Sequence, residues 1–278
     1  MEALQLATLI TYNPWTVRSD TLLGEIDERF AAMGIHHVPV VDDDRRPVGM
    51  ISETDLLRAR QARRMLATVG GGGEPTGWAG QTAASVMQRA VQVADPTDSP
   101  RQALQVLLSF GIHALPVVEN GRLVGVVTSR DFLRECSYGE LPVSRRPISE
   151  FVQPAKETLE PETTLEQALL TMHERGASCL AVAQDGCPLG TLSQRDIVRA
   201  HCLAGEETED EYGFATSPPN VMRAARAGNP LRPGQRLHEA AAAMLADGLS
   251  AVLVANQANR LLGVLTEDDL LRIMQTAV

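Results

Sequence analysis

Lysine is nearly absent from this sequence of 278 residues. Lys156 is the sole lysine among 25 basic residues, so almost all fixed positive charge is carried by arginine. A guanidinium presents several N–H donors in one plane, which suits two-point contacts with carboxylate or phosphate groups. Positive charge is also outnumbered, because 35 acidic residues give a formal net charge of −10. Neither half of the chain has the positive excess that binding to a nucleic-acid backbone requires, so we expect no nucleic-acid partner.

Cysteine is scarce too. The four cysteines are Cys136, Cys179, Cys187 and Cys202, and no two of them form a C-x-x-C pair. Their spacing fits neither a zinc ribbon nor a disulfide framework. The pattern indicates reduced, mostly buried thiols in a cytoplasmic protein.

Long apolar runs and catalytic motifs are missing as well. No stretch reaches the roughly 18 apolar residues that a membrane-spanning helix needs. The segment MEALQLATLITYNPW has no basic region followed by a long apolar one, so we expect neither a membrane anchor nor a secretory signal. The sequence also lacks a nucleophile elbow, a Gly-Lys-Ser/Thr phosphate loop, a dinucleotide-binding glycine fingerprint and a metal-binding motif. We therefore expect no enzymatic activity.

What the sequence does contain is one pattern written four times. It reads GIHHVPVVDDDRRPVGMISETDLLR, GIHALPVVENGRLVGVVTSRDFLR, GASCLAVAQDGCPLGTLSQRDIVR and GLSAVLVANQANRLLGVLTEDDLLR. Each copy has three anchors, namely an apolar residue, a glycine and an aspartate. In copies one to four they are Val17, Gly34 and Asp55; Val93, Gly111 and Asp131; Leu159, Gly176 and Asp196; and Leu231, Gly248 and Asp269. The nearly constant separation of the anchors indicates an internal repeat.

Copy one illustrates the local structure that the pattern predicts. Apolar residues in TLLGEIDERFAAMG recur on one face of a helix, at Leu22, Ile26, Phe30 and Met33. Gly34 is placed to end that helix in the left-handed conformation. HVPVV and PVGMIS read as two short strands around a polar turn, and a second helix follows. Each copy is thus predicted to be α+β, in the order strand, helix, strand, strand, helix. A single copy buries little apolar surface, so copies are expected to pair.

Two insertions interrupt the repeat spacing. They are ATVGGGGEPTGWAG within the first pair of copies and AGEETEDEYGFATSPP within the second. We predict four repeats at residues 1–68, 82–138, 146–204 and 218–278. Consecutive copies are expected to form one module over about residues 1–140 and another over about residues 141–278.

The repeated motif resembles a known family. The pattern G-[ILA]-x-x-x-P-V-V, a turn, and then G-apolar-apolar-[ST]-x-x-D at the head of a helix is similar to the cystathionine β-synthase (CBS) domain over nearly the whole chain. The resemblance implies that consecutive copies pair sheet against sheet into two Bateman modules, which can stack into a disk. Four copies in one chain resemble the γ regulatory subunit of AMP-activated protein kinase and its stand-alone archaeal relatives. The family binds AMP, ADP, ATP, S-adenosylmethionine and dinucleotides, and some copies bind nothing.

The most informative segment of each copy is a Ser or Thr followed three places later by Asp. The pairs are Ser52 and Asp55, Thr128 and Asp131, Ser193 and Asp196, and Thr266 and Asp269. One interpretation is a capping box, which needs no ligand. The resemblance implies another, in which Asp accepts hydrogen bonds from both ribose hydroxyls and Ser or Thr contacts ribose or phosphate. The free N–H groups of a helix start favour phosphate at the same place.

The resemblance also implies an apolar slot for adenine, built from the N-terminal strand and the strand carrying P-V. In copies one and two it consists of Thr16, Val17, His37, Val38 and Pro39, and of Gln92, Val93, Ala114, Leu115 and Pro116. In copies three and four it consists of Thr158, Leu159, Cys179, Leu180 and Ala181, and of Pro230, Leu231, Ala251, Val252 and Leu253. Each apolar member is interpreted equally well as plain core, and both roles can hold together.

The copies differ in the residues next to the aspartate. Arg130 and Arg195 directly precede it in copies two and three, where a guanidinium can meet a phosphate. Copies one and four carry only uncharged or acidic side chains there, namely Glu53, Thr54, Glu267 and Asp268. Carboxylates that face the ligand would oppose a phosphate, so we rank copy two first, copy three second and the outer copies lower. The alternative is that these side chains point to solvent.

Two histidines stand at equivalent positions. His36 and His113 are matched by Ser178 and Ser250 in the other copies. Because no further ligands gather near them in the sequence, we predict no metal site. Two interpretations remain, a neutral histidine at the module interface and a phosphate contact from the neighbouring copy.

The residues and the resemblance together predict a regulatory protein. It is expected to bind AMP, ADP, ATP or a related adenosyl ligand and to modulate an unidentified partner protein. S-adenosylmethionine and a dinucleotide are the alternative ligands, and a structural or interaction protein with empty sites is the alternative function. Repeats and linkers account for the whole sequence, so the regulated activity is expected on another chain. Four copies can close a disk as a monomer, and a homodimer is the alternative.

Overall fold

The computed structural model describes residues 4–70, 78, 80–155, 157–204 and 220–277. Lys156, the side chain of Cys202 and most of the two insertions lie outside the described residues. The chain divides into two compact units, Met1–Thr128 and Ser129–Val278.

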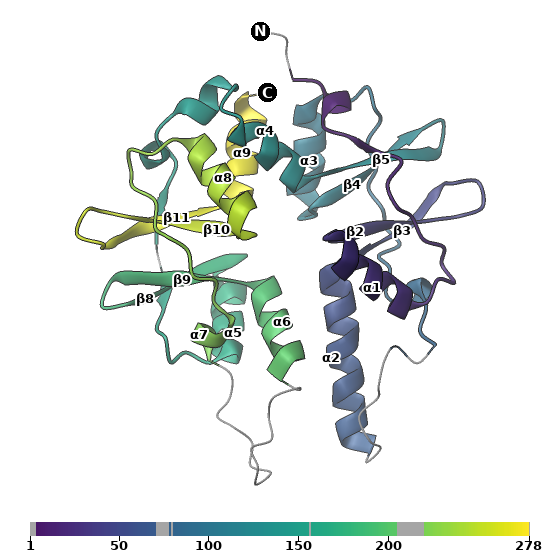
Figure 1. Ribbon diagram of the computed structural model, residues 1–278, viewed down its shortest axis with the longest axis horizontal. Coiled ribbons are helices and arrows are strands. Elements are labelled where there is room, and N and C mark those ends of the chain that lie inside the picture. The colour runs from purple at the N-terminus through teal and green to yellow at the C-terminus, as the bar shows by residue number, and fades with distance from the viewer. Residues whose placement is uncertain (1–3, 71–77, 79, 156, 205–219, 278) are drawn as a thin grey trace. The chain divides into compact units, whose positions relative to one another are not determined.

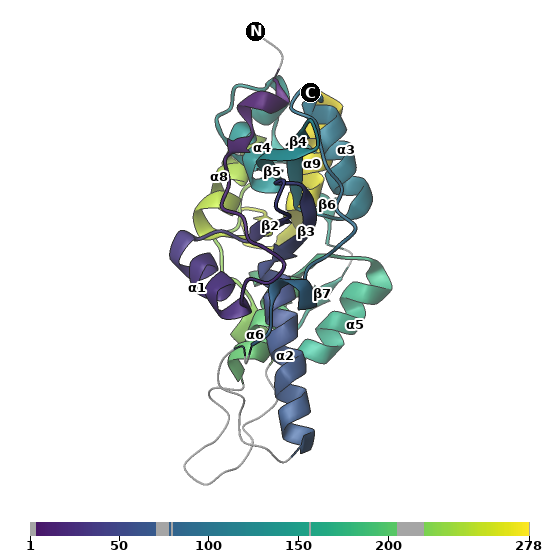
Figure 2. The same cartoon turned by 90° about the vertical axis from the view of Figure 1, so that its right-hand side faces the viewer.

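Unit 1 contains copy one and most of copy two (Figure 1). Its elements are the 3-10 turn η1 (Leu6–Thr8), β1 (Thr11–Tyr12), α1 (Leu23–Met33), β2 (His37–Val41), β3 (Pro47–Ser52), α2 (Glu53–Gly70), η2 (Ala83–Ser85), α3 (Pro100–Phe110), β4 (Ala114–Glu119) and β5 (Arg122–Thr128). Helices α1 and α2 both belong to copy one and contact each other (Figure 2).

Unit 2 contains the last helix of copy two and all of copies three and four. Its elements are α4 (Ser129–Ser137), η3 (Pro142–Arg145), η4 (Ile148–Glu150), β6 (Gln153–Pro154), β7 (Thr158–Leu159), α5 (Leu165–Arg175), β8 (Cys179–Gln184), β9 (Cys187–Ser193), α6 (Gln194–Ala204), α7 (Val221–Ala224), α8 (Leu237–Asp247), β10 (Ala251–Ala255), β11 (Leu261–Thr266) and α9 (Glu267–Ala277). The predicted alternation of helices and strands, and with it the α+β fold class, is confirmed.

The first helix of each copy ends as its glycine predicts. Gly34, Gly111, Gly176 and Gly248 all adopt the left-handed conformation, with φ between 60° and 63°. That conformation costs glycine little, because glycine has no Cβ to meet the following carbonyl. The start of α1 departs from the prediction, since Leu22 is 54% exposed while Leu23 is fully buried. Leu22 stands just before the helix, and its neighbour takes the core position instead.

Each copy forms an antiparallel hairpin with the same irregularity. The pairs β2–β3, β4–β5, β8–β9 and β10–β11 all carry a register shift at one equivalent place. The residue that begins each copy lies parallel to the first strand of its hairpin. The contacts are Val17 with Val40, Ala94 with Val117, Leu159 with Val182 and Leu231 with Val254.

Copy two corrects the predicted anchor by one residue. Ala94, which is buried, makes the strand contact, whereas Val93 is 46% exposed. Both residues are apolar, so the residue type alone could not decide between them. In the segment VQVADP these two apolar residues are adjacent, and the parallel bridge to Val117 selects the second.

The segment before each copy crosses to the hairpin of its partner copy. In unit 1, β1 pairs with β5, and Gln88 pairs with Met50 of β3. In unit 2, β6 pairs with β11, and Arg226 pairs with Thr191 of β9. Copy one is therefore joined to copy two, and copy three to copy four, by reciprocal exchange of these crossing segments. This is the consecutive pairing expected of two Bateman modules.

A glycine in each second strand makes room for the crossing segment. A Cβ on Gly190 would lie 2.8 Å from the carbonyl oxygen of Arg226, and one on Gly263 would lie 2.1 Å from that of Gln153. Real Cβ atoms do not approach a backbone oxygen so closely, so these positions require glycine. This explains why the repeated motif has Gly-apolar-apolar within its second strand.

The core of each unit lies between the first helix and the hairpin. In copy one it gathers Leu23, Ile26, Phe30, Val38 and Ile51. In copy three the equivalent cluster gathers Leu165, Ala168, Met172, Val182 and Ile197. Full burial of one such large apolar side chain stabilises the fold by about 1.5–3 kcal/mol.

Helix α4 ends copy two in the sequence but packs on copy four. Its side chains Phe132, Leu133 and Cys136 are almost completely buried. The helix contacts α8 and α9, beside which it lies in Figure 1. The repeat boundaries 1–68, 82–138, 146–204 and 218–278, and the module boundary near residue 140, remain predictions.

None of the helices within the described residues combines the length and the apolar character needed to cross a bilayer.

Candidate functional site

The candidate site of each copy is built where its second strand meets its second helix. In copy one, the N–H and the hydroxyl of Ser52 donate to Oδ2 of Asp55 at 2.8 and 2.6 Å. In return, the backbone N–H of Asp55 donates to Ser52 Oγ at 3.2 Å. Ser193 with Asp196 and Thr266 with Asp269 make the same three contacts.

These contacts make the capping interpretation correct, but it accounts for only one oxygen of each carboxylate. Oδ2 accepts two hydrogen bonds, one from the backbone N–H and one from the hydroxyl of the serine or threonine at the strand end. An aspartate reaches no further, because it is one methylene shorter than the glutamate of an ordinary capping box. Oδ1 is thus left for a second partner, which can be protein or ligand.

The second partner of Oδ1 differs between odd and even copies. In copies two and four it is the arginine one turn along the same helix, with Arg134 Nη1 at 2.7 Å from Asp131 and Arg272 Nη1 at 3.4 Å from Asp269. In copies one and three it arrives from the crossing segment of the partner copy. Gln88 Nε2 lies 3.2 Å from Asp55, and Arg226 Nε lies 3.2 Å from Asp196.

Gln88 and Arg226 were missed by the sequence analysis. They precede the first strand of their copies and show no motif of their own. Their role follows only from the crossing of the segments. Each pairs with the strand residue of the partner copy that lies five places before the motif aspartate of that copy. The usable signal was the Gly-apolar-apolar strand, whose glycine marks a close backbone approach.

The residues just before the aspartates face the partner copy in unit 2. Arg195 Nη2 donates to Ser250 Oγ at 3.2 Å, and Ser178 Oγ donates to Asp268 Oδ2 at 3.4 Å. The two contacts are reciprocal, since each joins the residue before an aspartate to the residue two places after a glycine in the other copy. For Arg195 and Asp268, these contacts favour a position toward the partner copy over the alternative that the side chains point to solvent.

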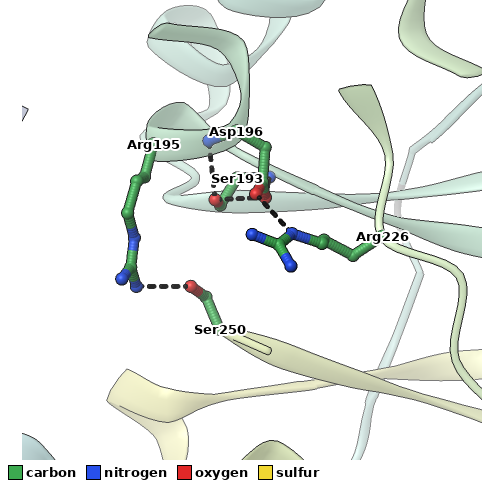
Figure 3. Close-up of polar contacts among 5 residues, drawn as sticks. All are labelled: Ser193, Arg195, Asp196, Arg226 and Ser250. Carbon is green, nitrogen blue, oxygen red and sulfur yellow. Dashed lines mark hydrogen bonds and ion pairs between the residues drawn. The ribbon is translucent and has the colours of Figure 1, made fainter. Parts of the chain in front are cut away.

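Two guanidinium groups converge on the copy-three helix start (Figure 3). Arg195 extends from α6 toward Ser250 of copy four, and Arg226 comes from copy four to Asp196. The Asp196 side chain is 11% exposed and that of Arg226 is 39% exposed. A largely buried carboxylate with one partly open guanidinium partner offers both an acceptor and cationic donors on one surface.

In copy one, none of the contacts described for unit 1 brings two arginines to the equivalent helix start. His36 Nδ1 lies 2.9 Å from Glu53 Oε2, so the histidine pairs with an acid at the start of its own copy's second helix. Gln88, which is neutral, takes the position of Arg226.

The predicted slot residues occupy the expected strands. The apolar members Val38, Pro39, Ala114, Leu115, Pro116, Leu180 and Val252 are all buried, whereas Thr16 and His37 are half-buried and Thr158 is exposed. Val93 points away, because Ala94 takes the strand position. Val38 and Leu180 belong to the hydrophobic clusters of their copies, so the core interpretation holds for them. Whether these residues also contact an adenine stays a prediction.

The slot predicted for copy four borders a small hollow of about 10 Å³. Val252 lines it together with Ala251, Leu253 and Arg226. A space of this size holds about one water molecule, so a purine can enter only if the walls move apart. Arg226 thus touches the carboxylate of copy three and the slot of copy four at once.

Copy two contributes residues to both units. Ala114, Leu115 and Pro116 lie on β4 in unit 1, where Ala114 pairs with Thr128. In unit 2, Asp131 is 8% exposed and Arg130 is half-buried in the first turn of α4.

Potential metal ligands do not gather. Within the described ranges, no three His, Cys, Asp or Glu side chains lie together as a metal site requires. Burial raises the pKa of the Cys136 and Cys179 thiols to about 12. A thiol with so high a pKa is a poor nucleophile and a poor metal ligand near neutral pH.

Paired α+β repeats, in which the aspartates of copies one and three also contact the partner copy, define a class of tandem domains. The CBS domain family model matches residues 6–62, 83–138, 144–202 and 230–276, and the chain therefore belongs to the CBS domain family.

The chain is similar to several known proteins and solved structures. An uncharacterized 33.4 kDa protein in a ribosomal RNA operon of Thermofilum pendens is 27% identical over 202 residues, which cover 68% of this chain and 62% of that protein. The crystal structure of MJ1225 from Methanocaldococcus jannaschii, a suggested archaeal homologue of g-AMPK, covers 98% of this chain and 100% of its own at 18% identity, with a TM-score of 0.70. A conserved protein from Pyrococcus horikoshii covers the same shares at 19% identity, with a TM-score of 0.64. These structural likenesses show the four-repeat fold.

The matched region spans only part of several relatives. It covers 32%, 62% and 39% of the length of the first three curated proteins that it matches.

Proposed function

We propose that this protein binds an adenosyl ligand, with an adenine nucleotide such as AMP, ADP or ATP as the preferred class, and that it regulates a partner protein. The observation that carries the proposal is the copy-three helix start. There, one carboxylate oxygen of Asp196 is held by the cap, and the other meets a guanidinium from copy four. Arg195 stands one residue away on the same helix turn.

The chemistry of a nucleotide fits these groups. A ribose carries two neighbouring hydroxyls, and a carboxylate is an acceptor that can take both. The phosphate carries negative charge, which the free N–H groups of a helix start and two guanidinium groups would stabilise. Ser193 would then contact the ribose or phosphate through the hydroxyl that now caps the helix. In copy two, Thr128, Arg130 and Asp131 are proposed to act in the same way.

The remaining copies are proposed as weaker or different sites. Asp55 with Ser52, and Asp269 with Thr266, keep the cap geometry but have no arginine just before the aspartate. Adenosine or S-adenosylmethionine is the alternative ligand for them, and an empty site is the other alternative. No metal is invoked at any copy.

The protein is proposed to act by binding and to lack catalytic activity. The chain would signal its ligand state to a separate protein, as a monomer or as a homodimer. We propose a cytoplasmic location from the use of cysteine, since buried reduced thiols suit a reducing compartment.

One observation favours a competing function. In copies one, three and four the Ser/Thr–Asp pair is already satisfied as a cap, so the motif persists in a purely structural protein as well. Ligand binding separates the two functions. A ligand at a concentration of 100 times its Kd stabilises the folded state by about 2.7 kcal/mol, which a thermal unfolding measurement detects.

The decisive experiment titrates AMP, ADP, ATP and S-adenosylmethionine into the intact protein by calorimetry. Asp196→Asn should weaken nucleotide binding at one site at least tenfold, because hydrogen bonds to a charged group are worth about 1.5–3 kcal/mol each. Asp185→Asn is the matched control, since it makes the same change in an exposed turn of the same copy. Absence of heat and of thermal stabilisation with every adenosyl ligand would leave the structural function as the correct one.

A further inference from the structure

Copies one and three differ in charge at one equivalent contact. Gln88 and Arg226 each come from a crossing segment, and each pairs with the strand residue five places before the partner's aspartate. Each contacts Oδ1 of that aspartate at 3.2 Å. Position and target are therefore the same, and only the chemistry of the donor differs.

The donors place different charges beside the proposed ribose acceptor. Gln88 offers a neutral amide to Asp55, so the carboxylate keeps its negative charge without a formal counter-charge at that contact. Arg226 offers a guanidinium to Asp196 and forms an ion pair with it. Nε makes the contact, so the remaining donors of the guanidinium fork are directed elsewhere.

The environment of each contact strengthens the difference. In copy three, Arg195 extends from the same helix start and adds a second positive charge (Figure 3). In copy one, the corresponding residue is Thr54, and Glu53 beside it pairs with His36. Among the contacts described for the two helix starts, those of copy three bring two arginines to the helix start, and those of copy one bring a neutral amide.

We infer that Gln88 and Arg226 are specificity-determining residues, which set the charge of the adenosyl ligand that each odd copy accepts. Arg226 directs copy three toward ligands with an anionic tail, such as a nucleoside phosphate. Gln88 directs copy one toward ligands whose tail is uncharged or cationic. The inference rests on the proposed function, because it assigns a preference within the adenosyl class.

The structure also explains why the preference is exerted from the partner copy. The aspartate and its cap serine belong to one copy, but the residue that completes the carboxylate comes from the other. Neither copy three nor copy one therefore has a complete site without its partner. Arg226 in addition lines the hollow beside Val252, so a ligand at either place in unit 2 would meet it.

The experiment exchanges the two residues. AMP and adenosine are titrated by calorimetry into the intact wild-type chain, Arg226→Gln, Gln88→Arg and Arg226→Lys. The same changes are repeated in chains whose other three motif aspartates are Asn, which isolates one odd copy at a time. Thermal unfolding without ligand verifies that each variant is folded.

The ratio of AMP affinity to adenosine affinity is the readout. Arg226→Gln should lower this ratio at copy three by about tenfold or more, since one charge-assisted contact is lost. Gln88→Arg should raise it at copy one, and Arg226→Lys should keep most of the wild-type preference. A ratio that stays the same in all variants, while both ligands bind, overturns the inference alone. Failure of both AMP and adenosine to bind the wild-type chain overturns this inference. If ADP, ATP and S-adenosylmethionine also fail to bind, the proposed function is overturned with it.

Discussion

The guanidinium of Arg195 donates a hydrogen bond to Ser250 Oγ at 3.2 Å and so joins the helix start of copy three to the strand entry of copy four. A serine hydroxyl is a modest partner for a charged group, and a phosphate would be a stronger one. The contact thus holds the arginine in place at the surface that both copies share. The reciprocal contact between Ser178 and Asp268 has the opposite charge, which makes the two ends of the interface unequal.

Each pair of copies has one helix start with an arginine just before the aspartate, at Arg130 and at Arg195. We therefore predict two tight AMP sites per chain. Arg195→Ala and Arg130→Ala should each weaken one of them by about tenfold or more, because each removes a charge-assisted contact with phosphate. Arg175→Ala is the matched control, since Arg175 is exposed and pairs only with Glu157 among the contacts described for it. Calorimetry at low ionic strength measures the number of sites and their affinities. Four equal sites, or arginine variants with wild-type affinity, would contradict the prediction.

A comparison of two caps separates stability from binding. Ser193→Ala and Thr164→Ala each remove a hydroxyl that accepts a hydrogen bond from a helix N–H. Each change should lower the free energy of unfolding by about 1 kcal/mol. Only Ser193→Ala should also weaken AMP binding, because Thr164 caps α5 and takes no part in the candidate site. Denaturant titration and calorimetry together test this, and equal effects of both variants on AMP would show that the Ser193 effect is structural.

The crossing segments predict which glycines tolerate a methyl group. Gly263→Ala should destabilise the protein by about 1–3 kcal/mol, since the new Cβ would press on backbone that cannot easily move. Its Cβ would lie 2.1 Å from the Gln153 carbonyl oxygen, whereas Gly234 has no neighbour within 4 Å of its Cβ position. Gly234→Ala therefore serves as the control and should change the free energy of unfolding little. A neutral Gly263→Ala in denaturant titration would mean that β6 does not lie on β11 as described.

The buried thiols predict an alkaline loss of stability. Burial raises the pKa of Cys136 and Cys179 from 9.0 to about 12, with the charges of Glu135 and Asp196 acting in the same direction. The unfolded thiols ionise first, so their contribution is complete below about pH 9 and is lost as the pH rises toward 12. Replacing both cysteines by alanine should flatten this part of the curve of unfolding free energy against pH.

Peptide mapping after alkylation at pH 8 should find Cys187 modified faster than Cys136 and Cys179, and equal rates would contradict the burial.

Much of the local structure could be predicted because it depends on residues close in the chain. Gly34 ends α1 for a backbone reason that the sequence shows directly, and Ser52 with Asp55 forms a cap across three residues. The strands were visible as HVPVV and PVGMIS for the same reason. Family membership followed from those motifs, since they recur with nearly constant spacing.

The contacts that complete the candidate site could not be predicted in this way. Arg226 lies 30 residues from Asp196. No sequence pattern between them indicates that the segment containing Arg226 crosses to the hairpin of copy three. The error at Val93 has a similar origin, because the partner strand selects which of two apolar residues turns inward. The direction of Arg195 also required the partner copy, since Ser250 lies 55 residues away.

Helix α4 belongs to the first pair of copies by sequence and to the second compact unit by packing. It ends copy two in the sequence, yet it packs on α8 and α9 in the same compact unit as copy four, and its side chains Phe132, Leu133 and Cys136 are buried. A gene fragment cut after the first two repeats would carry this helix away from α8 and α9, and both fragments would expose apolar surface that the intact chain covers. Cutting the chain between the two pairs of copies would therefore cost stability that the intact chain keeps.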